Sequence, residues 1–301
     1  MTLVTAVCAV CGEGTANPVY PGTIALADQR DPAVYFSSSR RVAGYLPIVR
    51  CARCGLLMTS PRDDETTLGR IYSELTDRSG EHEDAARRRN RVDELALVKR
   101  YALPPGRLLD VGCSAGLFVC AAQKAGWEAT GVDPSAWAVA RGLERCPGVR
   151  FRAGLLSEVD FPAGSFEVVT LWNVLEHLPR PAETLDRIRS WLSRDGWLFL
   201  SLPNADSRVA RLMGKRWVLL LREHLWYFSP ATMATLLSRS GFVLADARPK
   251  RLSSSVAHMV GRLAQSGKAA GRLSRIGALR RLTVRLSVGE MYVVARRAPA
   301  P

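Results

Sequence analysis

The fold of this chain is decided by the stretch Leu108-Leu109-Asp110-Val111-Gly112-Cys113-Ser114-Ala115-Gly116-Leu117-Phe118. Its apolar start is typical of a buried strand, and the small residues that follow favour a tight turn into a helix. A dinucleotide-binding turn needs glycine at positions 112, 114 and 117, but serine and leucine stand at the last two. The pattern Asp-x-Gly-x-x-x-Gly instead places a carboxylate at the strand end. Such a carboxylate suits an amino group or another cationic ligand.

Strand-like and helix-like segments alternate outward from this stretch. Before it, a charged helix is expected over residues 85–102, and Pro104-Pro105-Gly106 ends it. A later helix is expected to begin at Pro230 behind the N-cap Ser229 and to close at Gly241. The alternation predicts an α/β fold, with a Rossmann-like, seven-stranded, mostly parallel sheet and helices on both faces. The predicted strands are 107–111, 128–132, 149–153, 166–171, 197–201, 242–247 and 291–295.

A second carboxylate ends the next predicted strand along the chain. Asp133 stands in Thr130-Gly131-Val132-Asp133-Pro134-Ser135, 23 residues after Asp110. An acid at this place can accept hydrogen bonds from both ribose hydroxyls of a nucleoside. The alternative is a helix cap before Pro134. Because Asp110 stands at the neighbouring strand end, the ligand-binding role is favoured.

Four motifs resemble those of class I S-adenosylmethionine-dependent methyltransferases, and they occur in the same order. The resemblance covers about residues 100–295 and is specific for the superfamily rather than for a substrate. Ser114 replaces a commoner third glycine and Glu167 replaces an aspartate, but neither change removes a required charge. The motifs are 109–116, 132–135, Phe166-Glu167-Val168-Val169-Thr170-Leu171-Trp172-Asn173-Val174-Leu175-Glu176-His177-Leu178 and Leu198-Phe199-Leu200-Ser201-Leu202-Pro203-Asn204.

The resemblance implies S-adenosylmethionine as the cofactor and transfer of its methyl group as the reaction. The first motif would frame the methionine part, and Asp133 would hold the ribose. Leu155 would flank adenine. Many relatives have an acid at this position that binds the adenine amine, and here the backbone would make that contact instead. Trp172 and Asn173 would lie between cofactor and acceptor. The implied cofactor-binding residues are Asp110, Gly112, Cys113, Gly116, Asp133, Leu155, Trp172 and Asn173.

Two of the four histidines are candidate catalytic bases. The sulfonium is already an activated methyl donor, so the protein mainly has to align acceptor and donor. A hydroxyl acceptor also gains from a base that removes its proton, by about a hundredfold to ten-thousandfold. His177 follows the fourth strand, and His224 lies in an aromatic stretch; a packed or loop-orienting role is the alternative for each. Glu176 is expected to be structural, and His82 and His258 are expected to take no part.

Four of the seven cysteines form two Cys-x-x-Cys-Gly units near the start of the chain. Two such units can supply four thiolates to a tetrahedral zinc ion, and a site with four protein ligands has a structural role. A redox dithiol and unrelated buried thiols are the alternatives. A cytosolic chain disfavours stable disulfides, and Cys113, Cys120 and Cys146 are scattered. The predicted zinc ligands are Cys8, Cys11, Cys51 and Cys54.

These features predict a zinc-binding module over residues 1–75, a linker helix over 76–104 and a methyltransferase domain over 105–301. Within that domain, 205–230 and 250–288 are expected to be acceptor or cap insertions. Short strands are expected near Tyr35-Phe36 and over 45–49, and a short helix near 63–72. The cysteine module resembles the zinc-binding extension of some small-molecule methyltransferases, certain sugar methyltransferases among them. The segment Glu223-His224-Leu225-Trp226-Tyr227-Phe228-Ser229-Pro230 resembles one found in that subgroup before the last helix.

The net charge of +14 is concentrated near the C-terminus, where residues 247–289 hold ten basic side chains and no acid. This segment could face nucleic acid, an anionic membrane or an anionic substrate, or be a solvated surface. Residues 254–286 favour one or two amphipathic helices that cover the pocket, form a dimer contact or lie on an anionic membrane. Residues 205–222 are basic and aromatic, which suits an acceptor bearing a phosphate or nucleoside diphosphate.

The favoured function is methyl transfer to a small molecule, on a hydroxyl of a sugar or secondary metabolite. The alternatives are RNA methylation that uses the basic segment, and a non-catalytic scaffold that binds the cofactor. Nucleic acid is the less favoured substrate, since Trp172-Asn173-Val174-Leu175 replaces the Asn-Pro-Pro-Tyr type sequence of amino-group methyltransferases. No run approaches the roughly 18 to 20 apolar residues of a membrane-spanning helix, and no basic signal-peptide start is present, so a cytoplasmic location is expected.

Overall fold

The computed structural model describes residues 3–24, 44–76, 85–255 and 283–299. Its largest element is a seven-stranded sheet in the order β12-β13-β10-β9-β6-β7-β8. Strands β10, β9, β6, β7 and β8 run parallel, and β13 is antiparallel to both of its neighbours. This confirms the predicted α/β fold. The strands are β6 (Arg107–Val111), β7 (Glu128–Asp133), β8 (Arg150–Ala153), β9 (Phe166–Trp172), β10 (Leu192–Pro203), β12 (Phe242–Ser255) and β13 (Thr283–Arg297).

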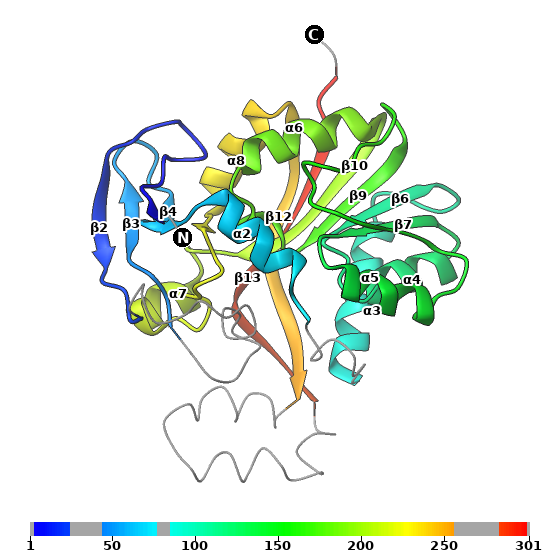
Figure 1. Cartoon of the computed structure of the whole chain (residues 1–301), viewed down its shortest axis with the longest axis horizontal. Helices are drawn as coiled ribbons and strands as arrows, with labels where there is room; N and C mark the ends of the chain where they lie inside the picture. The colour runs from blue at the N-terminus through cyan, green and yellow to red at the C-terminus, as the bar shows by residue number, and fades with distance from the viewer. Residues whose placement is uncertain (1–2, 25–43, 77–84, 256–282, 300–301) are drawn as a thin grey trace.

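Helices cover both faces of the sheet (Figure 1). One face carries α3 (Ala85–Lys99), α4 (Leu117–Lys124) and α5 (Ala136–Arg145). The other face carries α6 (Pro181–Trp191) and α8 (Pro230–Arg239). The charged helix expected before the first strand is α3, and it packs against α4 and β12. It therefore belongs to the layer that covers the sheet.

Both faces of the sheet are buried because apolar side chains along each central strand point alternately to one face and the other. Leu108 packs in the cluster on the α3 and α4 side, whereas Leu109 packs in the cluster on the α6 and α8 side. Val168 and Val169 divide in the same way. A parallel sheet that is covered on both faces needs near-continuous apolar runs. These runs are the signal that identified the strands in the sequence.

The last helix begins and ends as the sequence predicts. The hydroxyl of Ser229 accepts a hydrogen bond from the N–H of Thr232, whose own hydroxyl accepts one from the N–H of Ser229. Pro230 stands at the start of α8, and Gly241 follows the helix with a φ of 73°. Reciprocal capping and a glycine after the last turn are strong boundary signals. These signals fix the first and last residues of α8, and with them the end of the segment that precedes it.

The cysteine module forms a second, four-stranded sheet in the order β11-β4-β3-β2. Three of its strands lie within the module: β2 (Ala16–Tyr20), β3 (Ile48–Cys51) and β4 (Leu57–Thr59). The fourth, β11 (Trp226–Tyr227), comes from the segment just before α8. A single small sheet thus joins residues that are far apart in the sequence.

Two further elements complete the module. β1 (Leu3–Val4) pairs with β5 (Arg62–Asp63), and the short helix expected near residues 63–72 is α2 (Glu65–Ser73). Leu68 and Ile71 of α2 are buried in the same apolar cluster as residues of α6 and α8. The module and one face of the large sheet therefore share one core, while the domain limits at residues 75 and 104 stay predictions.

The structure corrects the interpretation of the basic C-terminal segment at both of its ends. Strand β12 continues to Ser255 instead of ending near residue 247, and β13 begins at Thr283. The stretch 283–286 is therefore strand instead of amphipathic helix. Pairing between Leu252 and Leu286 extends the two strands as an antiparallel ribbon. Residues 284–288 alternate apolar and polar side chains, and this two-residue period is the signal that a helical interpretation overlooked.

Several expectations fall on residues outside the described part of the chain. These are the strand near Tyr35-Phe36, the roles of His82 and His258, and the helices expected over residues 256–282. Within the described residues, every helix is too short or too polar to cross a lipid bilayer.

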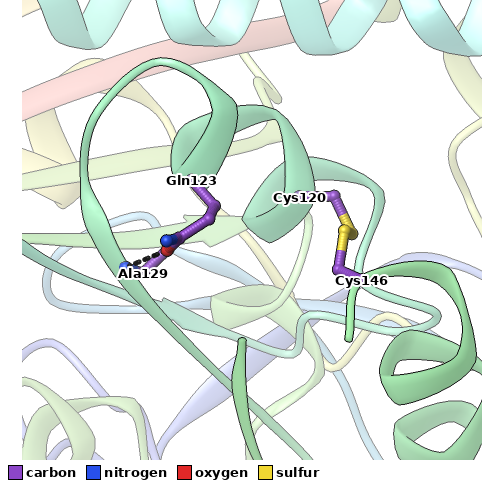
Figure 2. Close-up of a disulfide and its surroundings, with 4 residues drawn as sticks. All are labelled: Cys120, Gln123, Ala129 and Cys146. Carbon is purple, nitrogen blue, oxygen red and sulfur yellow. Dashed lines mark hydrogen bonds between the residues drawn. A yellow bond between two sulfur atoms is a disulfide. The ribbon is translucent and has the colours of Figure 1, made fainter. Parts of the chain in front are cut away.

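A disulfide links two helices on one face of the sheet, contrary to the expectation that stable disulfides are disfavoured. Cys120 of α4 is bonded to Cys146, the residue that ends α5, with a Cα–Cα distance of 5.9 Å (Figure 2). That separation is within the usual range for a disulfide. The two cysteines are 26 residues apart, so only the placement of α4 and α5 on the same face of the sheet brings them together.

We expect this bond to contribute about 3 kcal/mol to the free energy of unfolding, since it closes a loop of 26 residues. Urea unfolding of the oxidised and reduced protein measures the contribution. In the Cys146→Ala variant, reductant should have no effect on the unfolding midpoint. Peptide mapping without reductant that finds Cys120 and Cys146 in unlinked peptides would contradict the pairing.

Candidate active site

Three parallel strands end side by side and form the C-terminal edge of the sheet. Asp110 lies near the end of β6, Asp133 ends β7, and Asn173 directly follows β9. Asp110 pairs in register with Gly131 of β7 and Thr170 of β9. Ligands of parallel sheets bind outside this edge. The structure therefore brings the predicted cofactor residues of three motifs to one place.

Asp110 is buried and held by a single short contact. The hydroxyl of Thr170 donates to its Oδ1 at 2.6 Å. Burial raises the pKa of Asp110 to about 7, and the hydrogen bond from Thr170 only partly offsets this. A buried carboxyl with such a pKa ionises readily when a cation approaches. Asp110 is thus suited to a positively charged group of a ligand.

Two glycines let the backbone after β6 turn sharply. Gly112 and Gly116 have φ values of 69° and 74°, which side-chain-bearing residues rarely adopt. A Cβ on Gly112 would lie 2.4 Å from a methyl group of Val174, and one on Gly116 would lie 2.6 Å from the ring of Phe151. Cys113 is buried between them. The motif therefore needs both glycines for its own shape.

Asp133 holds the loops that follow β6 and β7 at the C-terminal edge of the sheet. Its Oδ2 accepts from the N–H of Ser114 at 2.8 Å, and its Oδ1 accepts from the N–H of Ser135 at 2.9 Å. The cap of α5 is Ser135, whose hydroxyl accepts from the N–H of Ala138. Each carboxylate oxygen keeps a second lone pair. Asp133 can therefore bind a ribose while it anchors the glycine turn.

The remaining predicted cofactor residues lie in different surroundings. Leu155 is partly buried and near α2, and its N–H donates to a side-chain oxygen of Glu158. The indole of Trp172 packs against Phe118 and Tyr292 in the core on the α3 and α4 side. Trp172 is therefore a core residue in this structure, whereas its neighbour in the sequence lies at the edge.

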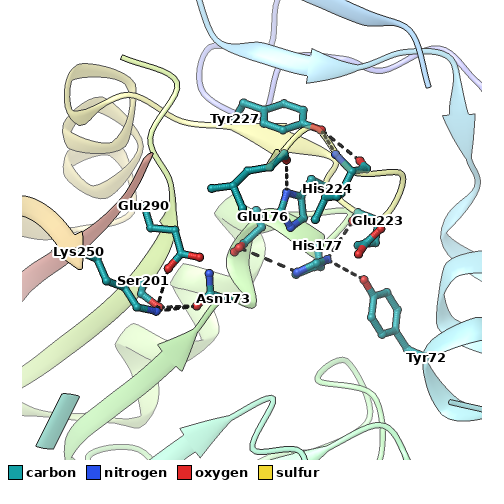
Figure 3. A network of polar contacts seen from close by, with 12 residues as sticks. Tyr72, Asn173, Glu176, His177, Ser201, Glu223, His224, Tyr227, Lys250 and Glu290 are labelled. Carbon is teal, nitrogen blue, oxygen red and sulfur yellow. Dashed lines mark hydrogen bonds and ion pairs between the residues drawn. The ribbon is translucent and has the colours of Figure 1, made fainter. Parts of the chain in front are cut away.

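A buried lysine holds Asn173 in place. Asn173 has a φ of 57°, and its Oδ1 accepts from Nζ of Lys250 at 2.9 Å and from the hydroxyl of Ser201 at 2.8 Å. Nζ of Lys250 also lies 3.0 Å from Oε2 of Glu290 on β13. These contacts leave the amide nitrogen of Asn173 on the side of Glu176 (Figure 3).

The two candidate histidines lie together, and Glu176 stands between them and Asn173 (Figure 3). His177 belongs to the short 3-10 helix Leu175–His177 after β9, and His224 precedes β11. Their ring centroids are 4.8 Å apart. Nδ1 of His177 is 2.9 Å from the hydroxyl of Tyr72 on α2. The predicted bases are thus brought together, and the cysteine module supplies a third polar side chain.

Burial shifts the pKa values of His177 and Glu176 toward their neutral forms. It lowers the pKa of His177 to about 4 and raises that of Glu176 to about 8. Glu176 is fully buried, and its side chain lies next to the two histidines. The sequence predicted a structural role for Glu176 and did not indicate Tyr72 or Lys250 as site residues. No local pattern marks Tyr72, and Lys250 was counted only as part of the basic segment.

Basic residues near the site differ in availability. Arg222 is buried against Asp63 of β5 at 3.4 Å, so it neutralises an acid of the module. The basic side chains of α7 (Arg208–Met213) and of the 3-10 helix Gly214–Arg216 are exposed. In the described part of the basic C-terminal segment, Arg285 pairs with Asp93 at 2.6 Å. Part of the positive charge is thus compensated by acids from other elements.

Comparison with known proteins identifies the family. A methyltransferase-domain family matches residues 82–247. A ubiquinone biosynthesis O-methyltransferase of Marinobacter nauticus is 31% identical over 173 residues, which are 53% of this chain and 71% of that protein. The corresponding enzyme of Hahella chejuensis is 30% identical over 50% of this chain and 68% of its own length. The chain belongs to the class I S-adenosylmethionine-dependent methyltransferases.

Solved structures agree with this methyltransferase fold. A methyltransferase of Bacillus halodurans has a TM-score of 0.51 and 15% identity, with 69% of this chain and all of that chain covered. The cyclase SpnF has a TM-score of 0.50 and 20% identity, with 76% and 86% covered. At such identities the likeness shows the fold alone. One of the two proteins is a cyclase, so this fold does not by itself define the reaction. S-adenosylmethionine is the cofactor that the family assignment supports.

The cysteine module of this methyltransferase gathers all four predicted zinc ligands. Their Sγ atoms lie within 4.8 Å of one another, with 3.4 Å between Cys8 and Cys54 and 3.5 Å between Cys11 and Cys51. Four ligands at about 2.3 Å around a tetrahedral zinc ion lie about 3.8 Å apart. The thiols are not joined as disulfides, so the geometry fits a metal ion better than a redox pair.

We expect cofactor affinity to depend on pH through Asp110. In the predicted pairing of Asp110 with the amino group of S-adenosylmethionine the carboxyl is ionised, so affinity should rise as pH increases from about 5.5 to 7.5, by up to about tenfold per unit below pH 7. Calorimetry with the cofactor measures the slope. Asp110→Asn should weaken binding by about 1.5–3 kcal/mol and remove most of the dependence. An unchanged slope in this variant would assign the dependence to another group.

Proposed function

We propose that this methyltransferase transfers the methyl group of S-adenosylmethionine to a hydroxyl of a small-molecule acceptor, such as a sugar or a secondary metabolite. The observation that carries the proposal is the histidine pair, His177 and His224, next to Glu176 at the C-terminal edge of the sheet. A methyl acceptor with a hydroxyl is the kind that needs a proton removed. The relatives named O-methyltransferases support the same atom.

The arrangement of hydrogen bonds suits proton removal by an imidazole. A backbone carbonyl can only accept, so Nδ1 of His224, 2.9 Å from the carbonyl of Leu219, carries the proton. Its Nε2 then has a lone pair that can accept a proton from the acceptor. Burial keeps His177 neutral at neutral pH, which a base requires, although its lowered pKa makes it the weaker candidate.

An acceptor that carries a phosphate is a further part of this proposal. The exposed basic residues of α7 and the following 3-10 helix stand in the same inserted segment as His224. Arginine binds phosphate through two parallel hydrogen bonds. Arg222 is excluded from this role because Asp63 already pairs with it. Titration with a sugar phosphate and its unphosphorylated form would compare the two acceptors directly.

We expect His224→Ala or His177→Ala to lower turnover by at least about tenfold with little change in affinity for S-adenosylmethionine. The assay follows formation of the demethylated cofactor with a panel of sugars, phosphorylated sugars, phenols and RNA. Cofactor affinity is measured separately by calorimetry. Full turnover in both variants would remove the histidines from the mechanism, and transfer to RNA alone would contradict the small-molecule acceptor.

The proposal includes a structural zinc ion held by Cys8, Cys11, Cys51 and Cys54. The glycine after each pair has a φ near 75°, as the tight turn around a metal requires. The N–H of Gly12 donates to the carbonyl of Cys8, and that of Gly55 to the carbonyl of Cys51. With all four ligands from the chain, the ion would hold the module's fold and take no part in the chemistry.

We expect Cys11→Ser to lose one zinc equivalent and to unfold at a lower urea concentration than the wild-type protein. Because the module's sheet includes β11, methyl transfer should fall as well. Metal analysis and urea unfolding are the measurements, and Cys113→Ser, a cysteine variant outside the cluster, is the control for zinc content alone. Identical zinc content and unfolding midpoints for Cys11→Ser and the wild-type protein would contradict the zinc site.

A further inference from the structure

Three side chains that can bind a metal ion converge at the C-terminal edge, away from the cysteine cluster. Glu176, His177 and His224 each offer one ligand atom, and these atoms lie within 4.8 Å of one another. Figure 3 shows the three side chains pointing toward one another. Two come from the 3-10 helix after β9 and the third from the loop before β11. Only the tertiary structure assembles this set.

Backbone carbonyls decide which nitrogen each histidine offers. Nδ1 of His177 is 2.9 Å from the carbonyl of Glu223, and Nδ1 of His224 is 2.9 Å from the carbonyl of Leu219. Because a carbonyl only accepts, both Nδ1 atoms carry the proton and both Nε2 atoms carry a lone pair. Histidines that bind metals commonly donate their other N–H to a backbone carbonyl. Both histidines have this arrangement.

The third side chain is a fully buried carboxylate. The side-chain amide of Asn173 lies near the carboxyl of Glu176. Within the described residues, however, neither oxygen of Glu176 has a partner at the distance and angle of a good hydrogen bond. Its Oε1 is 4.0 Å from Nε2 of His177, which is too long for a hydrogen bond. Two ligand atoms bound at about 2.0–2.2 Å to a tetrahedral zinc ion lie about 3.4 Å apart. The two groups are therefore close enough to share a cation after a movement of about 0.6 Å.

The nearest buried ammonium is already engaged elsewhere. Nζ of Lys250 donates to Asn173 and Ser201 and pairs with Glu290. It therefore influences Glu176 only at a distance. A buried carboxyl is stable when it is paired, protonated or bound to a metal, and the lone pairs of the two neighbouring imidazoles would join it in binding a metal.

We propose that Glu176, His177 and His224 bind a divalent cation of the zinc class and leave a coordination position open to the oxygen of the acceptor. Two histidines and one glutamate are a ligand set of catalytic zinc sites, in which the fourth position holds water or substrate. Nitrogen and oxygen ligands without a thiolate distinguish this site from the cysteine cluster. The separation of 4.0 Å between Oε1 of Glu176 and Nε2 of His177 exceeds the roughly 3.4 Å of a tetrahedral site, so binding would draw the side chains together.

The role in catalysis rests on the proposed function. The acceptor hydroxyl would displace a hydroxide from the cation, and its proton would leave in the water molecule formed. The acceptor oxygen then bonds to the methyl carbon as the carbon–sulfur bond breaks, giving a methyl ether and the neutral thioether. A cation lowers the pKa of a bound oxygen toward neutrality. The two histidines would then be ligands, and the loss of turnover expected for their alanine variants would follow from loss of the cation.

Titration of the full chain with Co²⁺ tests the site after the cysteine cluster has been filled with zinc and loosely bound metal has been removed. We expect one further equivalent, with the absorption of cobalt bound by nitrogen and oxygen and without thiolate charge transfer. Glu176→Gln keeps the side chain's size and shape and adds no buried charge, so it should fold. It should weaken cobalt binding by at least about a hundredfold, more than loss of a supporting contact usually costs.

Glu144→Gln is the matched control, since this exposed carboxylate on α5 pairs only with Arg141 in the described structure. It should bind cobalt as the wild-type protein does. Absence of a second equivalent in the wild-type protein, or equal binding in Glu176→Gln, would overturn the site. Methyl transfer by protein that holds only the cysteine-bound zinc would also overturn it and leave the proposed function intact. Failure to bind S-adenosylmethionine would instead contradict the proposed function without touching the metal titration.

Discussion

The candidate active site at the C-terminal edge of the sheet depends on a two-residue strand pairing between distant parts of the chain. Trp226 and Tyr227 of β11 pair with Met58 and Leu57 of β4. On the other side of this segment, the N–H of Leu225 donates to the carbonyl of Glu176 at 2.9 Å. The segment is thus held between the cysteine module and the turn after β9. Because both sides are fixed by backbone hydrogen bonds, His224 and His177 have a defined separation before any ligand binds.

Burial of charge is the second feature that the site depends on. Asp110, Asp133, Glu176, Glu290 and Lys250 all lie at or beside the C-terminal edge with little exposure. Removing such groups from water is costly unless each finds a partner. Lys250 and Glu290 form an ion pair with one another. The oxygens of the other acids can still bind a ligand. The arrangement is therefore prepared for cationic groups, which agrees with a sulfonium cofactor and with the cation inferred beside the histidines.

The sequence predicted most of the sheet because its signals are local. Apolar runs marked the strands, and the Ser229 cap with Gly241 marked the last helix. The failures have equally specific causes. The ribbon formed by the ends of β12 and β13 was missed because a two-residue alternation was interpreted as a helical pattern around arginines. Cys120 and Cys146 were treated as scattered because their proximity depends on how two helices pack.

By itself, the sequence determined the α/β fold, the cofactor motifs with Asp110 and Asp133, the paired cysteines and the two histidines. Each motif consists of residues that are close together in the chain, so their spacing alone fixes which side chains share a turn or a strand end. The tertiary structure decided that Trp172 is a core residue and that Tyr72, Glu176 and Lys250 belong to the active edge. These assignments rest on contacts between distant residues, such as Tyr72 and His177, which are 105 positions apart. No local pattern encodes such contacts, because they arise only when separate elements pack into one core.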